Sequence, residues 1–134
     1  MARSALGLMV MSSPANSEAL IKQLEGLGIE FLATITCRQA RQLLRADAPI
    51  DVVITDTSLP DGNWSDVLRE VVDSGSQANV VVNAIAPDAV LWSEVLWRGV
   101  YDMITAPHKR HEVRQVIGSA VRTSFPRSEV AGLH

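Results

Sequence analysis

The stretch ITDTSLPDG, Ile54 to Gly62, places an aspartate directly after an apolar run and a Leu-Pro turn just after that aspartate. The run Asp51 to Thr55 is apolar and β-branched, which is typical of a strand buried on both faces of a sheet. Asp56 therefore stands where such a strand ends. A carboxylate in this place can act as a nucleophile toward a phosphoryl group, provided that neighbouring groups activate it.

Similar apolar runs alternate with helix-like segments along the whole chain. The other predicted strands are Ala5 to Met11, Ile29 to Ile35, Asn79 to Ala84 and Tyr101 to Thr105. The predicted helices cover residues 17–27, 37–46 and 64–73, a segment after Pro87 that ends at Gly99, and residues 110–123. This alternation predicts an α/β fold, a flavodoxin-like (βα)₅ doubly wound parallel sheet with strand order 2-1-3-4-5.

Length and composition narrow the class of protein. At 134 residues, with 47% hydrophobic and 20% charged residues, the chain fits one soluble globular domain. We expect this domain over residues 1–123 and a flexible tail or linker start over residues 124–134. The net charge of −3 argues against a nucleic-acid surface, and no apolar run approaches the ~20 residues of a membrane span. The single cysteine, Cys37, excludes an intramolecular disulfide and favours a cytoplasmic location.

In an open parallel sheet, ligands bind outside the carboxyl ends of the strands. In this sequence the predicted strands end at Ser12 and Ser13, at Asp56, near Asn83 and Ala84, and at residues 105–107. Asp56 is the only ionisable residue among them. The sequence therefore predicts that a site at this edge of the sheet would include the Asp56 carboxylate.

The segment DVVITDTSLPDG resembles the centre of a response-regulator receiver domain, the phosphoacceptor module of two-component signalling. The segment GVYDMITAPH, Gly99 to His108, is similar to the family's fifth strand, which ends in Lys-Pro. The resemblance spans the chain up to about Thr123. It implies that Asp56 is the phosphoacceptor, that the Ala106–Pro107 bond is cis, and that the domain is a signalling module and not an enzyme.

In the family, other residues assist the phosphoacceptor aspartate, and the matching positions of this sequence hold different residues. The acidic pair that holds Mg²⁺ falls on Ser12 and Ser13, and the lysine falls on Ala106. The hydroxyl position falls on Ala84, with Asn83 in the alternative register, and the aromatic switch position falls on Met103. The Ser58 main-chain carbonyl could still contribute to a metal site. With Asp56 as the only carboxylate ligand, we expect no metal or other cofactor, although Mg²⁺ is the family's ion.

Few nearby residues could replace the missing metal ligands and the missing lysine. His108 could swing toward Asp56, whereas Lys109 starts from a different backbone direction. Glu18 falls inside the first helix, and Asp61 lies on the loop after Asp56, where it could approach a cation. Two interpretations of Asp56 therefore stay open. It is either an inherited residue that caps the strand-to-helix loop, or a retained phosphoacceptor.

The fourth helix contains two tryptophans. Trp92 is in step with Leu96 and fits the core, whereas the position of Trp97 is normally polar and exposed in the family. Either Trp97 contacts another protein, or it folds over the core and shields it. Trp92, Trp97 and Tyr101 mark the helix 4–strand 5–helix 5 face that receiver domains commonly use for protein contacts.

These observations favour an atypical receiver domain, a pseudo-receiver with a degenerate active site, in phosphorelay signal transduction. Its expected work is protein–protein interaction with an output domain, a sensor kinase or a second copy, with weak or no phosphorylation at Asp56. The alternative is a functional phosphoacceptor that takes phosphate on Asp56 from a histidine kinase. An unrelated enzyme or nucleotide-binding protein is disfavoured, because the segment SSPANS has no glycine to cradle a phosphate. No nucleic-acid or membrane partner is expected for this domain.

Overall fold

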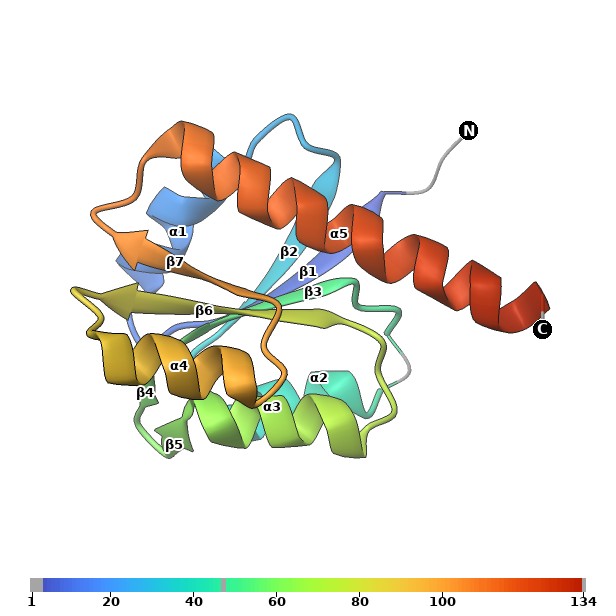
Figure 1. The fold of residues 1–134 in the computed structure, drawn as a ribbon, viewed down its shortest axis with the longest axis horizontal. Coiled ribbons are helices and arrows are strands. Elements are labelled where there is room, and N and C mark those ends of the chain that lie inside the picture. Colours follow the sequence, from blue (N-terminus) through green and yellow to red (C-terminus); the bar gives the residue numbers. More distant parts are fainter. Residues whose placement is uncertain (1–3, 47, 134) are drawn as a thin grey trace.

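A parallel five-stranded sheet forms the centre of the molecule (Figure 1). The computed structural model describes residues 4–46 and 48–133, with side chains up to Ser124. The sheet order is β2-β1-β3-β6-β7, and every neighbouring pair is parallel. Counted along the chain, this is the predicted order 2-1-3-4-5, which is confirmed. The strands are β1 (Ala5–Val10), β2 (Ile29–Thr34), β3 (Val52–Asp56), β6 (Asn79–Ile85) and β7 (Asp102–Ala106).

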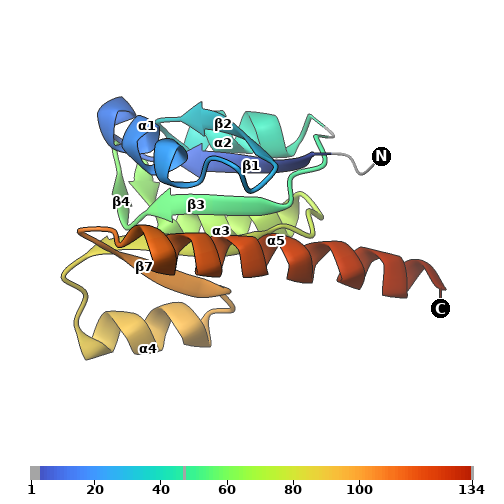
Figure 2. The same ribbon diagram turned by 90° about the horizontal axis from the view of Figure 1, so that it is seen from above.

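Five helices cover the two faces of the sheet (Figures 1 and 2). One face is covered by α1 (Pro14–Gln23) and α5 (Arg110–Leu133). The other face is covered by α2 (Cys37–Leu44), α3 (Trp64–Asp73) and α4 (Ala89–Trp97). This arrangement follows from right-handed crossovers between parallel strands, which place the connecting helices on either side of the sheet.

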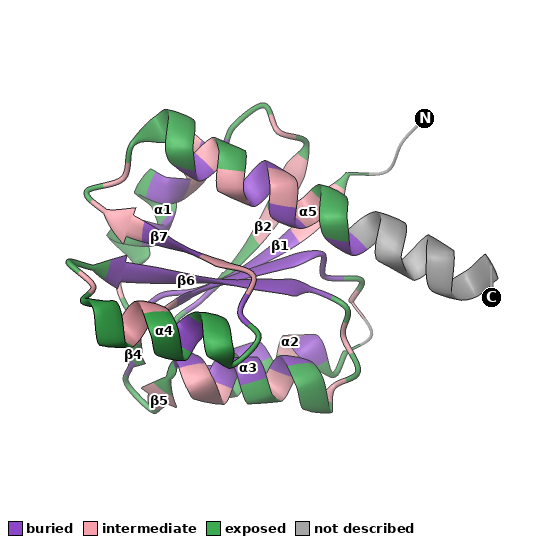
Figure 3. Ribbon diagram, viewed as in Figure 1, coloured by how far each residue is buried: buried purple, intermediate pink, exposed green. Residues whose placement is uncertain are grey.

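Each face of the sheet has its own hydrophobic core. Successive side chains of a strand point to opposite faces, so β6 places Val80, Val82 and Ala84 in the core beneath α2, α3 and α4, and Val81 in the other. The second core lies beneath α1 and α5, where Leu20 and Ile117 are buried. The buried stretches run through the middle of the molecule in Figure 3.

The strand β2 differs from its prediction, which had assumed burial on both faces. It pairs with β1 alone and therefore lies at the edge of the sheet. Its residues are largely intermediate or exposed, and Leu32 is exposed. An edge strand has a neighbour on one side only, so its side chains are less completely covered.

The ends of four helices also differ from their predictions. The helix α2 ends at Leu44 and not at residue 46, and α4 ends at Trp97, two residues before Gly99. The helix α1 begins at Pro14 and not near Ser17, because Ser13 caps it and a proline suits the first helical position. The helix α5 continues past the predicted end at Thr123 to Leu133. At this point Ser124 is buried and its hydroxyl donates to the Val121 carbonyl. That residues 124–134 begin a linker stays a prediction.

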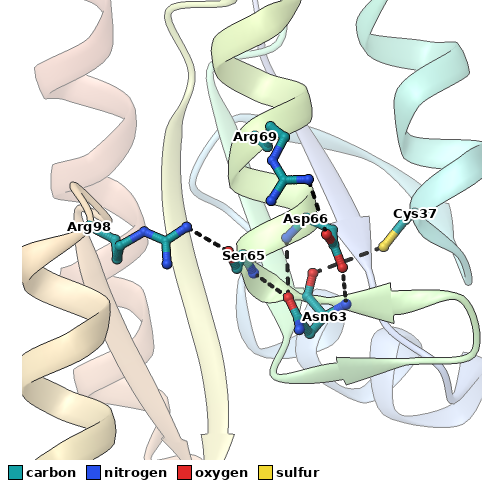
Figure 4. A network of polar contacts seen from close by, with 6 residues as sticks. All are labelled: Cys37, Asn63, Ser65, Asp66, Arg69 and Arg98. Carbon is teal, nitrogen blue, oxygen red and sulfur yellow. Dashed lines mark hydrogen bonds and ion pairs between the residues drawn. The ribbon is translucent and has the colours of Figure 1, made fainter.

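A short antiparallel hairpin, β4 (Ser58–Leu59) with β5 (Gly62–Asn63), leads from Asp56 into α3. Asn63 caps this helix: its Oδ1 accepts from the N–H groups of Ser65 and Asp66, and Asp66 Oδ2 accepts from the Asn63 N–H. Figure 4 shows this capping box, together with Arg98, whose Nη2 donates to Ser65 Oγ at 2.7 Å. The hairpin thus fixes the start of α3, and Arg98 links the end of α4 to it.

Candidate functional site

The carboxyl ends of β1, β3, β6 and β7 surround one pocket of about 350 Å³. Parallel strands end at the same edge of the sheet, which brings together residues that are distant in sequence. Asp56 is the only acidic residue in the lining. The lining residues are Met11, Ser12, Asn16, Ala19, Asp56, Thr57, Ser58, Asn83, Ile85, Ala106, Pro107 and His108.

Both carboxylate oxygens of Asp56 accept hydrogen bonds from the protein itself. Oδ2 accepts from the Ser12 N–H at 3.0 Å and from the Ser12 hydroxyl at 3.3 Å. Oδ1 accepts from Asn83 Nδ2 at 3.0 Å. All three donors belong to neutral groups, so this carboxylate has no cationic partner within hydrogen-bond distance among the contacts of the described residues.

A chain of side chains continues from Asp56 through Asn83 to His108. The Asn83 amide donates to Asp56 through Nδ2, so its Oδ1 faces His108, whose Nε2 lies 2.6 Å away. An amide oxygen only accepts, and His108 Nε2 therefore carries the hydrogen. Burial lowers the pKa of His108 below its ordinary value of 6.5, against the opposing effect of the Asp56 carboxylate.

Two sequence assignments at this pocket need correction. Of the two registers considered for the hydroxyl position, Asn83 pairs with Asp56 across the strands, whereas Ala84 points into the opposite core and is fully buried. Of the two serines after β1, Ser12 lines the pocket, but Ser13 accepts from the Asn16 N–H as the cap of α1. Met11 lines the pocket in its place.

The other assigned positions fall at or beside the pocket. Ala106 and Ser58 line it, and the Ala106–Pro107 bond is cis, as the resemblance implies. Met103 is buried under the α4 side of the sheet and also borders a second hollow, between α4 and α5, that includes Trp92 and Lys109. Lys109 is therefore directed to that hollow and is absent from the lining around Asp56.

The acidic residues considered as replacement ligands lie elsewhere. Asp61 accepts from the N–H groups of Cys37 and Arg38 at 2.8 and 3.0 Å and so caps α2, which lowers its pKa. Burial, with the nearby Asp61 carboxylate, raises the pKa of the Cys37 thiol to about 11. Glu18 is exposed and does not line the pocket. These residues stabilise the fold or face solvent and do not converge on Asp56.

The pocket does not fit the Mg²⁺ ion that the resemblance implies. This cation needs octahedral oxygen ligands, usually including one or two carboxylates. The lining supplies the Asp56 carboxylate alone, with the thioether of Met11 beside it. Among the described residues, no group of three His, Cys, Asp or Glu side chains is placed to hold a metal.

The residues assigned to the interaction face have different surroundings. Trp97 is 88% exposed, so it does not shield the core. Trp92 is half-buried against the core under α4. The Tyr101 hydroxyl lies 2.7 Å from Ser119 Oγ and 3.5 Å from Thr123 Oγ1, which fixes the ring against α5. Trp97 is thus the member of this set that a partner could contact most fully.

Sequence reasoning missed the link between Asn83 and His108. The available signal was the strand alternation: with Val81 and Asn83 on one face, Asn83 belongs beside Asp56 and not in the core. The position of His108 directly after Pro107 gave a second hint. Its approach to Asn83 depends on the loop that joins β7 to α5, which periodicity does not describe.

Comparisons with known proteins agree with this geometry. No family model matches the chain. The chain is 27% identical over 124 residues to the response regulator protein PilR of Pseudomonas aeruginosa, a match that covers 92% of this chain and 28% of PilR. The chain thus spans little more than a quarter of that relative's length.

Solved structures share the fold. The signal receiver domain of an HD domain-containing protein from Pseudomonas fluorescens superimposes with a TM-score of 0.85 at 22% identity, covering 96% of this chain and 95% of that one. A response regulator receiver protein from Pseudomonas putida gives a TM-score of 0.77 at 24% identity, covering 89% and 99%. The chain therefore has the fold of receiver domains, with Asp56 at the end of β3, and its sequence is similar to part of the response regulator PilR.

Proposed function

We propose that this chain is a response-regulator receiver domain that acts mainly as a protein–protein interaction module, with weak or no phosphorylation at Asp56. The proposal rests on the surroundings of the Asp56 carboxylate. It is the only acid in its pocket, and neutral protein donors occupy both of its oxygens. Phosphoryl transfer depends on positioning and on electrostatic stabilisation of the developing charge. This pocket offers no second carboxylate for a metal and no lysine at the Ala106 position.

The exposed side chains of α4 support the interaction part of the proposal. Trp97 and Val90 are 88% and 73% exposed on this helix. Exposed tryptophans are enriched at the energetic centres of protein interfaces. The partners that fit a receiver domain are an output domain, a sensor kinase or a second copy. Among the described residues, no helix is long and apolar enough to cross a membrane.

The first test adds acetyl phosphate or beryllofluoride with Mg²⁺ to the chain and to the Asp56→Asn variant. Intact mass counts phosphoryl groups after acetyl phosphate, and tryptophan fluorescence follows the structural response to either reagent. We expect no added mass and the same fluorescence in both proteins. A saturable, Mg²⁺-dependent change that disappears in Asp56→Asn would establish the alternative, a functional phosphoacceptor.

A second test rebuilds the missing groups. The double variant Ser12→Asp with Ala106→Lys places a carboxylate and an ammonium group at two positions that line the pocket around Asp56. The carboxylate can help to hold Mg²⁺, and the ammonium group can neutralise charge on the phosphoryl group. We expect this variant to gain Mg²⁺-dependent phosphoryl mass that the parent chain lacks. The triple variant with Asp56→Asn is the control and should gain none.

A further inference from the structure

The pocket around Asp56 combines a single acidic group with a partly apolar wall. The apolar lining residues are Met11, Ala19, Ile85, Ala106 and Pro107. Ile85 and Ala106 pair at the ends of β6 and β7, which lie side by side in Figure 1. The side chain of Ile85 is 79% exposed, so it is not committed to either core. A pocket of about 350 Å³ is large enough for a small molecule with a polar and an apolar part.

The charge of Asp56 is not balanced inside this pocket. Among the described residues that line it, none is a lysine or an arginine. The three donors to the carboxylate, on Ser12 and Asn83, are neutral. His108 faces Asn83, and burial lowers its pKa below 6.5, so most of its imidazole is neutral at about pH 7.5. The pocket therefore carries a net negative charge and attracts a cation.

The oxygen atoms of the pocket suit an ammonium group better than a metal ion. Among the contacts of the described residues, Asp56 Oδ1 accepts one hydrogen bond, from Asn83 Nδ2, and a carboxylate oxygen can accept a second. The lining also includes two further residues with hydroxyl groups, Thr57 and Ser58. An ammonium group has three N–H donors and needs no octahedron of ligands, so one carboxylate and neutral oxygens can satisfy it.

We propose that this pocket binds the ammonium group of a primary alkylamine, with the charge at Asp56 Oδ1 and the alkyl chain along Ile85 and Pro107. The same group occurs in free small amines and at the end of a lysine side chain of a partner protein. The inference rests on the proposed function in one respect, because a phosphoryl group on Asp56 would occupy the same oxygens. It goes beyond that function by naming a ligand for the pocket.

An NMR titration with butylammonium chloride, at about pH 7.5 and constant ionic strength, tests the binding. The reporter is the amide signal of Ser12, whose N–H donates to Asp56. We expect saturable shifts with a Kd on the order of 1–10 mM, as suits so small a ligand. Tetramethylammonium has the charge without N–H donors, and butanol has the alkyl chain without the charge. Each should bind roughly tenfold more weakly or less, and equal shifts with all three would overturn the proposal.

Two substitutions test the role of the carboxylate. Asp56→Asn keeps the shape of the side chain but removes its charge, so the affinity for butylammonium should fall about tenfold or more. Asp73→Asn, the same change at an exposed acid on α3, is the matched control and should leave the affinity unchanged. Ala106→Lys gives an independent test, because it supplies an ammonium group from the lining itself and should compete with the amine. Full affinity in both Asp56→Asn and Ala106→Lys would contradict the proposal.

Ile85→Ser tests the apolar wall, and its exposed position makes the change compatible with the fold. In the parent chain, butylammonium should bind roughly tenfold more tightly than methylammonium, because three further CH₂ groups are partly buried. This ratio should shrink in Ile85→Ser, while the affinity for methylammonium stays the same. An unchanged ratio would contradict the proposed path of the alkyl chain.

Lysine with both α-groups capped, as Nα-acetyl-lysine amide, separates the two sources of the amine. An affinity equal to that of butylammonium assigns the pocket to a lysine side chain of a partner, whereas exclusion of the capped lysine assigns it to a free amine. Failure of every amine to bind would sink this inference and leave the proposed function intact. Phosphoryl mass on Asp56 would sink the proposed function, and the titration of the unmodified chain would still decide this inference.

Discussion

Asp56 keeps its position at the end of β3, but its hydrogen-bond partners are neutral groups of the protein. Ser12 holds Oδ2 and Asn83 holds Oδ1, at distances of 3.0 to 3.3 Å. A carboxylate with two occupied oxygens is well suited to joining the ends of β1, β3 and β6. At the scale of a residue, these contacts favour the structural interpretation of Asp56 over the nucleophilic one.

His108 should make the stability of the fold depend on pH. Its pKa in the folded chain is lowered, first by burial, so the unfolded chain binds more protons between that value and 6.5. The free energy of unfolding should therefore fall as the pH drops from 6.5 through the folded-state pKa. Urea unfolding of the chain and of His108→Gln at about pH 7.5 and pH 5.5 measures this. The loss on acidification should be smaller in His108→Gln.

Two controls sharpen this test. His111→Gln changes an exposed histidine in the first turn of α5 and should leave the loss at its original size. Asp56→Asn removes the charge that raises the pKa of His108, so the NMR titration midpoint of His108 should move to lower pH. An unchanged midpoint would show that the Asp56 charge does not act on His108.

At the scale of single elements, the start of α3 depends on the Asn63–Asp66 capping box. Asn63→Ala removes the side chain that accepts from two N–H groups, and we expect a loss of about 1–2 kcal/mol in the free energy of unfolding. Urea denaturation measures it. The matched control is Arg69→Ala, which removes an exposed ion pair to Asp66 at 3.7 Å on the same helix and should cost far less. Equal losses would mean that the cap contributes little.

A helix or strand can be predicted from the sequence when the residues that determine it lie within its own segment. The bounds of α3 at Trp64 and Asp73 were predicted correctly, because its apolar face and its start signals lie within the segment. The hairpin β4–β5 was missed, since strands of two residues have no periodicity to detect. The exposure of β2 was also missed, because an edge position depends on the sheet order and not on the strand's own residues.

The same reasoning explains which features of the candidate site could be predicted from the sequence. The sheet order and the position of Asp56 could be inferred from the sequence, because both depend on the alternation of strands and helices. The choice between Asn83 and Ala84 could not be made reliably, since a shift of one residue moves every side chain of a strand to the opposite face. The fit of His108 to Asn83 required the path of a loop that the sequence pattern does not fix.

At the scale of the whole molecule, α4 is attached less firmly than the other helices that cover the sheet. Val95 is its single buried residue, whereas α3 buries Trp64, Val67, Leu68 and Val71. Arg98 adds a connection at the end of α4: its guanidinium donates to Ser65 Oγ and lies 5.7 Å from the centre of the Trp64 ring. The helix α4, which exposes Val90, Leu96 and Trp97, is thus also a helix with a single buried residue.

Arg98→Ala should loosen α4 without unfolding the rest of the chain. The lost contacts are worth about 0.5–1.5 kcal/mol, so the amide hydrogens of α4 should exchange roughly 2- to 10-fold faster in hydrogen exchange. The amides of α3 and of the central strands should keep their rates, because their protection comes from the two cores. Faster exchange across the whole chain would mean instead that Arg98 stabilises the fold globally, and that α4 is not a separately opening layer.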